Sequence, residues 1–186
     1  MALFNKAELS GVRIFEKATA AEKATETAEG KTFDIFLSHS YSDKDSIKAI
    51  KQTIEEMSFS VYVDWIHDGQ LDRSKVTKES ADLLRKRMKQ CRTLFFVTSL
   101  TSPVSKWMPW ELGYFDAFKQ RVAILPIVET PAITNEYKGQ EYLGLYPYVA
   151  KDKLKGSEKL TLWIHEESNT YITFKSWLEG NNPEKQ

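Results

Sequence analysis

Hydrophobic residues along the chain alternate between short continuous runs and stretches with helical spacing. The run from Phe33 to Leu37 is typical of a buried strand, and the hydrophobic residues between Ile47 and Met57 then recur three or four positions apart, as on one face of a helix. From Phe59 to Trp65 hydrophobic and polar residues alternate, which predicts a second strand. Ser42, three residues before Asp45, is expected to cap the intervening helix.

The same alternation continues through the middle of the chain. Residues 66–77 hold few core-sized side chains and are expected to form an exposed loop, and the helix after them leads into an apolar strand at residues 94–97. A helix at residues 107–118 begins after Ser102-Pro103 and is unusually aromatic. It precedes a fourth apolar strand at residues 122–125.

Strand and helix patterns are weaker toward the end of the chain. Residues 142–149 and 160–164 are each expected to hold a strand, and residues 171–178 a last helix. Because short apolar strands alternate with helices, the sequence predicts an α/β fold. In this fold a central parallel sheet of about five strands carries helices on both faces.

The two ends of the chain differ from this core in composition. Residues 1–30 are expected to form a helical or flexible extension, which docks one helical turn onto the main body through Leu9, Val12 and Phe15. The domain proper is expected to span residues 31–180. Residues 181–186 are polar and are expected to form a disordered tail.

Composition and charge narrow the class of protein. The 186 residues hold 26 Lys and Arg against 26 Asp and Glu, so no global field attracts nucleic acid or an anionic membrane. Mean hydropathy is −0.45, and the sequence has neither a secretory leader nor an apolar stretch of about 20 residues. A single cysteine, Cys91, excludes an internal disulfide and is expected to be a semi-buried residue near a helix end. We therefore expect a cytoplasmic protein.

Polar residues follow the predicted strands at the points where a ligand would be expected. In a parallel α/β sheet the ligand crevice lies beyond the carboxyl ends of the strands. Ser38-His39-Ser40 follow the first strand, Asp64-Trp65 the second and Thr98-Ser99 the third. Hydroxyl groups beside a helix N-terminus can hold a phosphate without a glycine-rich loop, although serines are common in turns of every kind.

The aromatic helix places one carboxylate among rings. Its residues Trp107, Glu111, Tyr114 and Phe118 are separated by four, three and four positions, so they share a helix face. A carboxylate buried against aromatic surface has the perturbed environment that is typical of a catalytic acid or base. The alternative is a glutamate at the helix rim that bonds to a backbone amide or an arginine. Spacing alone does not decide between the two.

Several other kinds of site are not supported. The three histidines lack metal-ligand spacing, so no metal is expected, and the sequence has no nucleophile elbow, Walker loop or glycine-rich dinucleotide motif. A phospho-receiver domain would need an acidic pair at Ser38-His39 and an aspartate at Thr98-Ser99. The segment between Lys75 and Arg92 carries seven basic and two acidic residues, which indicates a solvated face or a docking surface.

Two motifs, in this order, resemble those of bacterial Toll/interleukin receptor (TIR) domains. Residues 34–40, Asp-Ile-Phe-Leu-Ser-His-Ser, resemble the opening strand and loop of that family. Residues 105–113, with Trp107 and Glu111, resemble the helix that carries its Trp-x-x-x-Glu signature. The resemblance covers residues 31–150 and implies a flavodoxin-like TIR fold.

In enzymatically active TIR domains, the resemblance implies cleavage of NAD between nicotinamide and ribose, with NAD as substrate and no further cofactor. By position, Glu111 would be the catalytic carboxylate, aimed at the positive charge that builds on the sugar as the glycosidic bond breaks. Trp107 would form a wall of the same pocket. Ser38, His39 and Ser40 would lie near the phosphates or ribose as substrate-binding residues.

The resemblance also implies partners and a biological role. TIR domains contact one another, and the loop at residues 66–77 corresponds by position to one that often does so. Stand-alone Thoeris-type TIR proteins turn NAD into a cyclic or modified ADP-ribose signal, which a separate effector protein reads in anti-phage defence, and this is the leading hypothesis. The alternatives are simple NAD depletion, a non-catalytic scaffold module and a nucleoside deoxyribosyltransferase-like enzyme. The identity of the product stays open.

Overall fold

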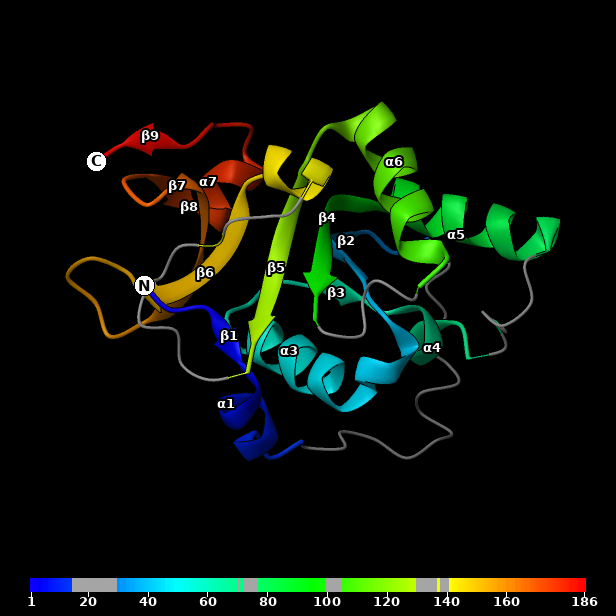
Figure 1. The fold of residues 1–186 in the computed structure, drawn as a ribbon, viewed down its shortest axis with the longest axis horizontal. Helices are drawn as coiled ribbons and strands as arrows, with labels where there is room; N and C mark the ends of the chain where they lie inside the picture. The colour runs from blue at the N-terminus through cyan, green and yellow to red at the C-terminus, as the bar shows by residue number, and fades with distance from the viewer. Residues whose placement is uncertain (15–29, 70, 72–76, 100–104, 130–136, 138–140) are drawn as a thin grey trace.

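A mixed sheet runs through the middle of the molecule (Figure 1). The computed structural model describes residues 1–14, 30–69, 71, 77–99, 105–129, 137 and 141–186. Within these residues the strands are β1 (Phe4–Asn5), β2 (Phe33–Ser38), β3 (Val61–Tyr62), β4 (Cys91–Thr98), β5 (Val122–Val128), β6 (Tyr148–Lys153), β7 (Leu160–Glu167), β8 (Thr170–Thr173) and β9 (Glu184–Lys185). The helices are α1 (Lys6–Gly11), α3 (Lys44–Glu56), α4 (Asp64–His67), α5 (Lys78–Gln90), α6 (Trp107–Lys119) and α7 (Phe174–Leu178), with 3-10 turns η1 (Tyr41–Asp43) and η3 (Glu141–Leu145).

The sheet order is β3-β2-β4-β5-β6-β7-β8-β9, and β1 pairs with β5 off this path. The strands from β3 to β6 pair in parallel, whereas β7, β8 and β9 continue the sheet antiparallel. The prediction of an α/β fold around a parallel sheet is therefore confirmed. The antiparallel extension is an addition that the weaker patterns after residue 128 did not indicate.

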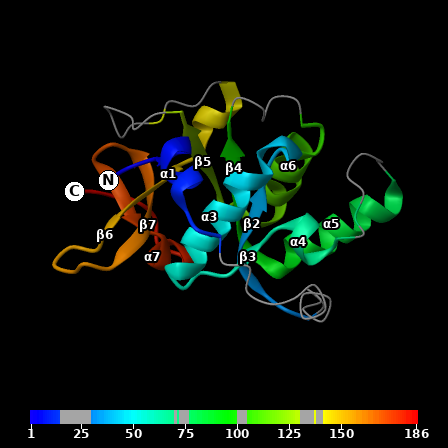
Figure 2. The same ribbon diagram turned by 90° about the horizontal axis from the view of Figure 1, so that it is seen from below.

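Helices cover both faces of the parallel strands (Figures 1 and 2). One face packs against α1, α3 and α7, whose buried residues include Ile50, Ile54 and Phe174. The other packs against α5 and α6 through residues such as Leu84 and Phe115. Because both faces are covered, β2, β4 and β5 are nearly continuous hydrophobic runs, as is usual for parallel strands.

The strand predicted at residues 59–65 is wrong in its second half. Only Val61 and Tyr62 pair with β2, and the chain then turns into α4 at Asp64. Val63 is buried and Trp65 packs partly against the same core. The hydrophobic residues of β3 and α4 therefore alternate with polar ones, as they would in a single longer strand. The carbonyl of Val63 accepts from the amides of Ile66 and His67, which closes the turn.

Element boundaries differ from the predictions at several other places. The helix expected at residues 171–178 begins only at Phe174, because the residues before it form β8. Asp43, not Ser42, occupies the N-cap position of α3, because η1 takes up the residues before it. The apolar residues after Tyr142 belong to η3, with Leu145 82% exposed, and the strand expected there begins only at Tyr148. Cys91 is the first residue of β4 and fully buried, and this burial raises the pKa of its thiol above the usual value.

Both ends of the chain take part in the sheet. Phe4 is fully buried and pairs with Ile127, and α1 lies beside α3 (Figure 2). Residues 181–186, for which composition predicts disorder, include β9, which pairs with β8 through backbone groups while its side chains are exposed. Such pairing needs no apolar side chain, so a polar sequence does not reveal it. Phe15, the rest of the expected extension to residue 29, and Ser102-Pro103 lie outside the described residues.

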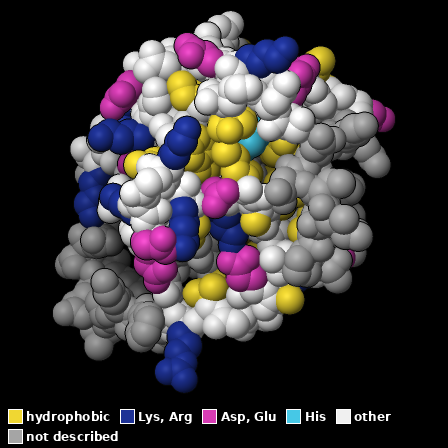
Figure 3. All heavy atoms as spheres, turned by 90° about the vertical axis from the view of Figure 1, so that its left-hand side faces the viewer, with side chains coloured by type: hydrophobic (Ala, Val, Ile, Leu, Met, Phe, Trp, Pro, Cys, Tyr) yellow, Lys and Arg dark blue, Asp and Glu magenta, His cyan; other side chains and the backbone are white. Residues whose placement is uncertain are grey.

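The face formed by the antiparallel strands and the chain ends carries both signs of charge. Figure 3 shows basic and acidic side chains interspersed around a central group of hydrophobic ones. In the part of the chain that the structure describes, every helix is too short or too polar to cross a bilayer.

Candidate active site

Glu111 lies on α6, whose packing turns it toward the sheet. The helix buries a stripe at positions 108, 112 and 115 against β4 and β5, and Glu111 and Trp107 lie next to this stripe. The Glu111 side chain is 0% exposed and that of Trp107 is 7% exposed. The same helix face becomes exposed toward its end, where Phe118 is 39% exposed. The expectation of a glutamate at the helix rim therefore does not hold.

Ser38 fastens the Glu111 carboxylate to the end of β2. The hydroxyl of Ser38 donates to Glu111 Oε2 at 2.6 Å, across 73 residues of sequence. Both side chains are completely buried, and a hydrogen bond this short to a carboxylate is of the strong, charge-assisted kind. A carboxylate is costly to bury without such partners. The structure thus brings together two predicted site residues at the carboxyl edge of the parallel strands.

Trp107 lies one helical turn before Glu111 and forms part of a ring cluster. Its ring meets that of Trp110 edge to face, with centroids 5.5 Å apart. Trp110 stacks on Tyr114 with centroids 5.8 Å apart, and the Arg85 guanidinium lies 5.3 Å from the Trp110 ring. These contacts hold Trp107 beside the carboxylate in an apolar surrounding, where electrostatic interactions are stronger than in water.

Both ring nitrogens of His39 hydrogen-bond to other parts of the protein. Its Nδ1 hydrogen-bonds to the carbonyl of Leu37 at 2.8 Å, and its Nε2 accepts from the indole N–H of Trp65 at 2.9 Å. Since an indole only donates and a carbonyl only accepts, these two bonds match the tautomer with the proton on Nδ1. Asp64 Oδ1 lies 3.7 Å from Nε2. Through these two bonds His39 ties the end of β2 to α4.

The loop after His39 is tied to the end of β4. Ser40 is 3% exposed, and its carbonyl accepts from the amide of Asp43 at 3.0 Å. The carboxylate of Asp43 in turn accepts from the hydroxyl of Ser99 at 2.6 Å. Ser99 stands at a strand end that the sequence singled out, but no sequence pattern paired it with Asp43.

Aromatic rings and ammonium groups lie close together just after this loop, on η1, α3 and α4. Tyr41 is 61% exposed, and Lys44 Nζ lies 3.6 Å from the centroid of its ring. Lys44 also lies 5.3 Å from the ring of Trp65, with Lys48 at 5.8 Å. These cation–π contacts hold positive charge near the carboxyl edge of the sheet. Sequence reasoning assigned no role at the site to Tyr41 or Lys44.

A buried ion pair anchors the segment after α4. Arg87 on α5 donates to both carboxylate oxygens of Asp68, at 2.8 and 2.7 Å, and the Tyr62 hydroxyl donates to Asp68 at 2.6 Å. Burial alone would raise the pKa of Asp68, but the hydrogen bonds from Arg87 and Tyr62 and the Arg87 charge outweigh it and hold that pKa below its usual value. Burial and the Asp68 carboxylate raise the pKa of Tyr62. This network fixes one end of the segment predicted as a loop at residues 66–77, most of which lies outside the described residues.

Two bacterial proteins resemble this chain, although no protein-family model matches it. A protein of Bacillus cereus (strain MSX-D12) named "Probable 3' cyclic ADP-D-ribose synthase ThsB'" is 51% identical over 172 residues, which cover 90% of this chain and 89% of that protein. A protein of Cytobacillus dafuensis named "Putative cyclic ADP-D-ribose synthase TIR2" is 38% identical over 85 residues, which cover 45% of this chain and 22% of that protein. The first similarity extends over nearly the whole of both chains, and the second over a shared segment.

Proposed function

This chain belongs to the family of bacterial TIR-domain cyclic ADP-D-ribose synthases, and we propose that Glu111 is the carboxylate with which it cleaves NAD. The enzyme is of the ADP-ribosyl cyclase type and serves in anti-phage defence. The observation that carries the assignment of Glu111 is its complete burial at the carboxyl edge of the sheet, with Ser38 bonded to it. A purely scaffolding role and a deoxyribosyltransferase-like activity do not fit this family.

The chemistry requires a negative group near the ribose that carries nicotinamide. When the bond between the anomeric carbon and the nicotinamide nitrogen breaks, its electron pair leaves with nicotinamide and positive charge develops on the sugar. A carboxylate held in place beforehand stabilises that charge without reorganising during the reaction. The hydrogen bond from Ser38 and the packing of Trp107 would supply this fixed orientation.

Cyclisation requires that a group of the same molecule reach the anomeric carbon before water does. For a 3′ cyclic product, we expect a 3′ hydroxyl of the ADP-ribose unit to form the new carbon–oxygen bond and to lose its proton to solvent or a nearby base. The apolar ring cluster around Trp107 would help to keep water away from the charged sugar. The 3′ isomer is proposed because of the 51% identity to the Bacillus cereus protein.

Ser38, Ser40 and Trp107 are proposed to line the substrate site, and His39 to position the others. Ser38 and Trp107 lie beside Glu111, and Ser40 belongs to the buried turn that follows. His39 would act through its bonds to Leu37 and Trp65 by holding the end of β2 in register with α4.

The role of Ser38 can be tested against a similar hydroxyl that lies outside the proposed chemistry. Ser38→Ala is expected to lower kcat for nicotinamide release about 10- to 100-fold with a small change in KM, because the carboxylate loses the group that orients it. Ser99→Ala removes a comparable bond, to Asp43 at 2.6 Å, and should change kcat less than about threefold. Equal kcat values for Ser38→Ala and wild type would contradict the proposed role.

Partners and location are also proposals. We expect the chain to self-associate through TIR–TIR contacts. Analytical ultracentrifugation of the purified protein tests this by measuring how its average mass in solution depends on protein concentration. A separate effector protein would read the cyclic product. The cytoplasm, where NAD is available, would be its site of action.

A further inference from the structure

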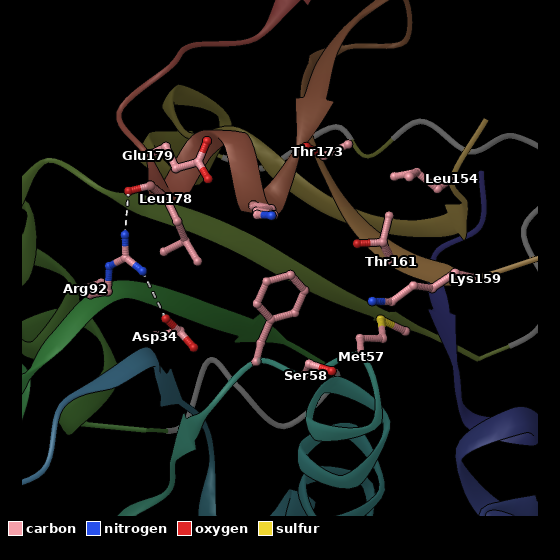
Figure 4. Close-up of a pocket in the computed structure, with 12 residues that line it drawn as sticks. Asp34, Met57, Ser58, Arg92, Leu154, Lys159, Thr161, Thr173, Leu178 and Glu179 are labelled. Carbon is pink, nitrogen blue, oxygen red and sulfur yellow. Dashed lines mark hydrogen bonds and ion pairs between the residues drawn. The ribbon is translucent and has the colours of Figure 1, made fainter. Parts of the chain in front are cut away.

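A cavity of about 720 Å³ opens at the edge of the sheet opposite Glu111. Asp34, near the start of β2, and Arg92, near the start of β4, form one wall (Figure 4). The segment after α3, the connection between β6 and β7, and the elements β7, β8 and α7 form the others. A volume of this size is in the range of pockets that hold small organic molecules.

One part of the cavity wall is apolar. Met57, Phe59, Leu154 and Leu178 line it, and Phe59 meets Phe174 edge to face with centroids 4.8 Å apart. This contact fixes the ring in one orientation. A flat apolar group could therefore bury surface here without displacing the core.

Three basic side chains, Arg92, Lys159 and Lys175, and two acidic ones, Asp34 and Glu179, line the cavity, which leaves an excess of one positive charge. Arg92 and Asp34 form an ion pair at 3.2 Å, and Asp34 also accepts hydrogen bonds from the amide and hydroxyl of Ser60. Lys159 and Lys175 also line the cavity, and among the described residues no acidic group lies within 4 Å of either ammonium. Figure 4 shows Lys159 extending into the cavity toward Met57, with Thr161 beside it.

We infer that this cavity binds a small organic anion that combines a flat apolar ring with a phosphate or carboxylate group. The ring would lie against Phe59 and Leu178, and the anion would lie between Lys159 and Lys175, with the hydroxyl of Thr161 as a further donor. An anion of this kind matches both the apolar wall and the two lysines, whereas a neutral ring or a bare phosphate matches only one of them.

The inferred site is separate from the proposed active site. Asp34 and Ser38 are four residues apart on β2, which places the cavity and Glu111 at opposite ends of the strand, about 13 Å apart along it. Ligand binding in this cavity is inferred from the cavity alone and can be tested whether or not the protein cleaves NAD.

Binding can be tested with three matched probes: 2-naphthyl phosphate, 2-naphthol and inorganic phosphate. Titrated into the full chain and followed by NMR, naphthyl phosphate should shift the amide signals of Phe59, Thr161 and Lys175. It should bind at least tenfold more tightly than either of the other two, which each lack one half of the ligand. Equal affinity for all three probes, or shifts confined to other residues, would overturn the inference.

Substitutions then separate this site from other anion sites. Lys159→Gln and Lys175→Gln should each weaken naphthyl phosphate binding about fivefold, because each removes an exposed charge contact. Lys155 is an exposed lysine in the same β6–β7 connection as Lys159, but it does not line the cavity. Lys155→Gln should therefore leave the affinity for naphthyl phosphate unchanged, as should Glu111→Gln. If Lys155→Gln weakens binding as much as Lys159→Gln does, the probe is responding to overall charge and the assigned site is wrong.

Discussion

Replacing Glu111 with glutamine is expected to lower the rate of nicotinamide release from NAD about a thousandfold. Glutamine keeps the size of the side chain and an oxygen that can still accept from Ser38, but it carries no negative charge to oppose the charge developing on the ribose. Removal of one such electrostatic contribution typically lowers kcat by about 10² to 10³. The variant should therefore fold normally and still bind NAD while turning it over very slowly.

The control is an exposed glutamate elsewhere on the sheet. Glu166→Gln on β7 makes the same chemical change at the surface and should leave the rate within about twofold of wild type. Thermal unfolding of both variants would show whether a loss of rate reflects loss of structure. Nicotinamide release by folded Glu111→Gln at the wild-type rate would refute the assignment.

Replacing Arg87 with alanine is expected to produce the largest loss of stability. It would leave the buried Asp68 carboxylate without the cation that holds it at 2.7 and 2.8 Å, and breaking a buried pair of this kind typically costs about 3–5 kcal/mol of unfolding free energy. For a chain of this size that corresponds to a fall in Tm of about 10 °C. Calorimetry or circular dichroism would measure it.

The matching control lies two residues earlier on the same helix. Arg85 pairs with Asp82 at 2.8 Å on the surface, so Arg85→Ala should cost less than about 1.5 kcal/mol, its contact with Trp110 included. Equal losses from the two substitutions would contradict the view that burial gives the Arg87 pair its importance.

The Arg87 effect should also depend on pH. The pKa of Asp68 is lowered in the folded protein, so its ionised form stabilises the fold above the pKa of the unfolded chain, about 4. This contribution is lost as the pH falls through the lower, folded pKa. The difference in stability between wild type and Arg87→Ala should therefore be full at neutral pH and should shrink as the solution is acidified below about pH 4.

The buried strands could be predicted from the sequence because each is a run of apolar residues. β2, β4 and β5 are covered on both faces, so their apolar runs identify them without knowledge of the fold. The alternating pattern at residues 59–65 predicts β3, but the strand has only two residues and is shorter than the pattern indicates. β9 pairs only through its backbone, so no pattern distinguishes it from a tail. The short helix α4 was read as strand because Val63 and Trp65 both contact the core.

Individual residues of the candidate site could be predicted from the sequence, but their contacts with one another could not. Spacing placed Trp107 beside Glu111, and the strand-end rule singled out Ser38, His39 and Ser99. The bonds that define their roles join positions far apart in the chain, such as Ser38 with Glu111 across 73 residues, and no local pattern encodes such pairs. His39 is another example, because its position predicts substrate contact, whereas its bonds to Leu37 and Trp65 follow from no pattern in the sequence.

Mass spectrometry of the nucleotide that the purified, concentrated protein forms from NAD tests the central claim most directly. We predict one nicotinamide released per NAD consumed and a nucleotide product lighter than ADP-ribose by one water molecule, as a cyclic ADP-ribose must be. NMR of that product would then identify the 3′ isomer. ADP-ribose as the sole product would contradict the proposed cyclisation, and NAD left intact at every protein concentration would contradict the catalytic account as a whole.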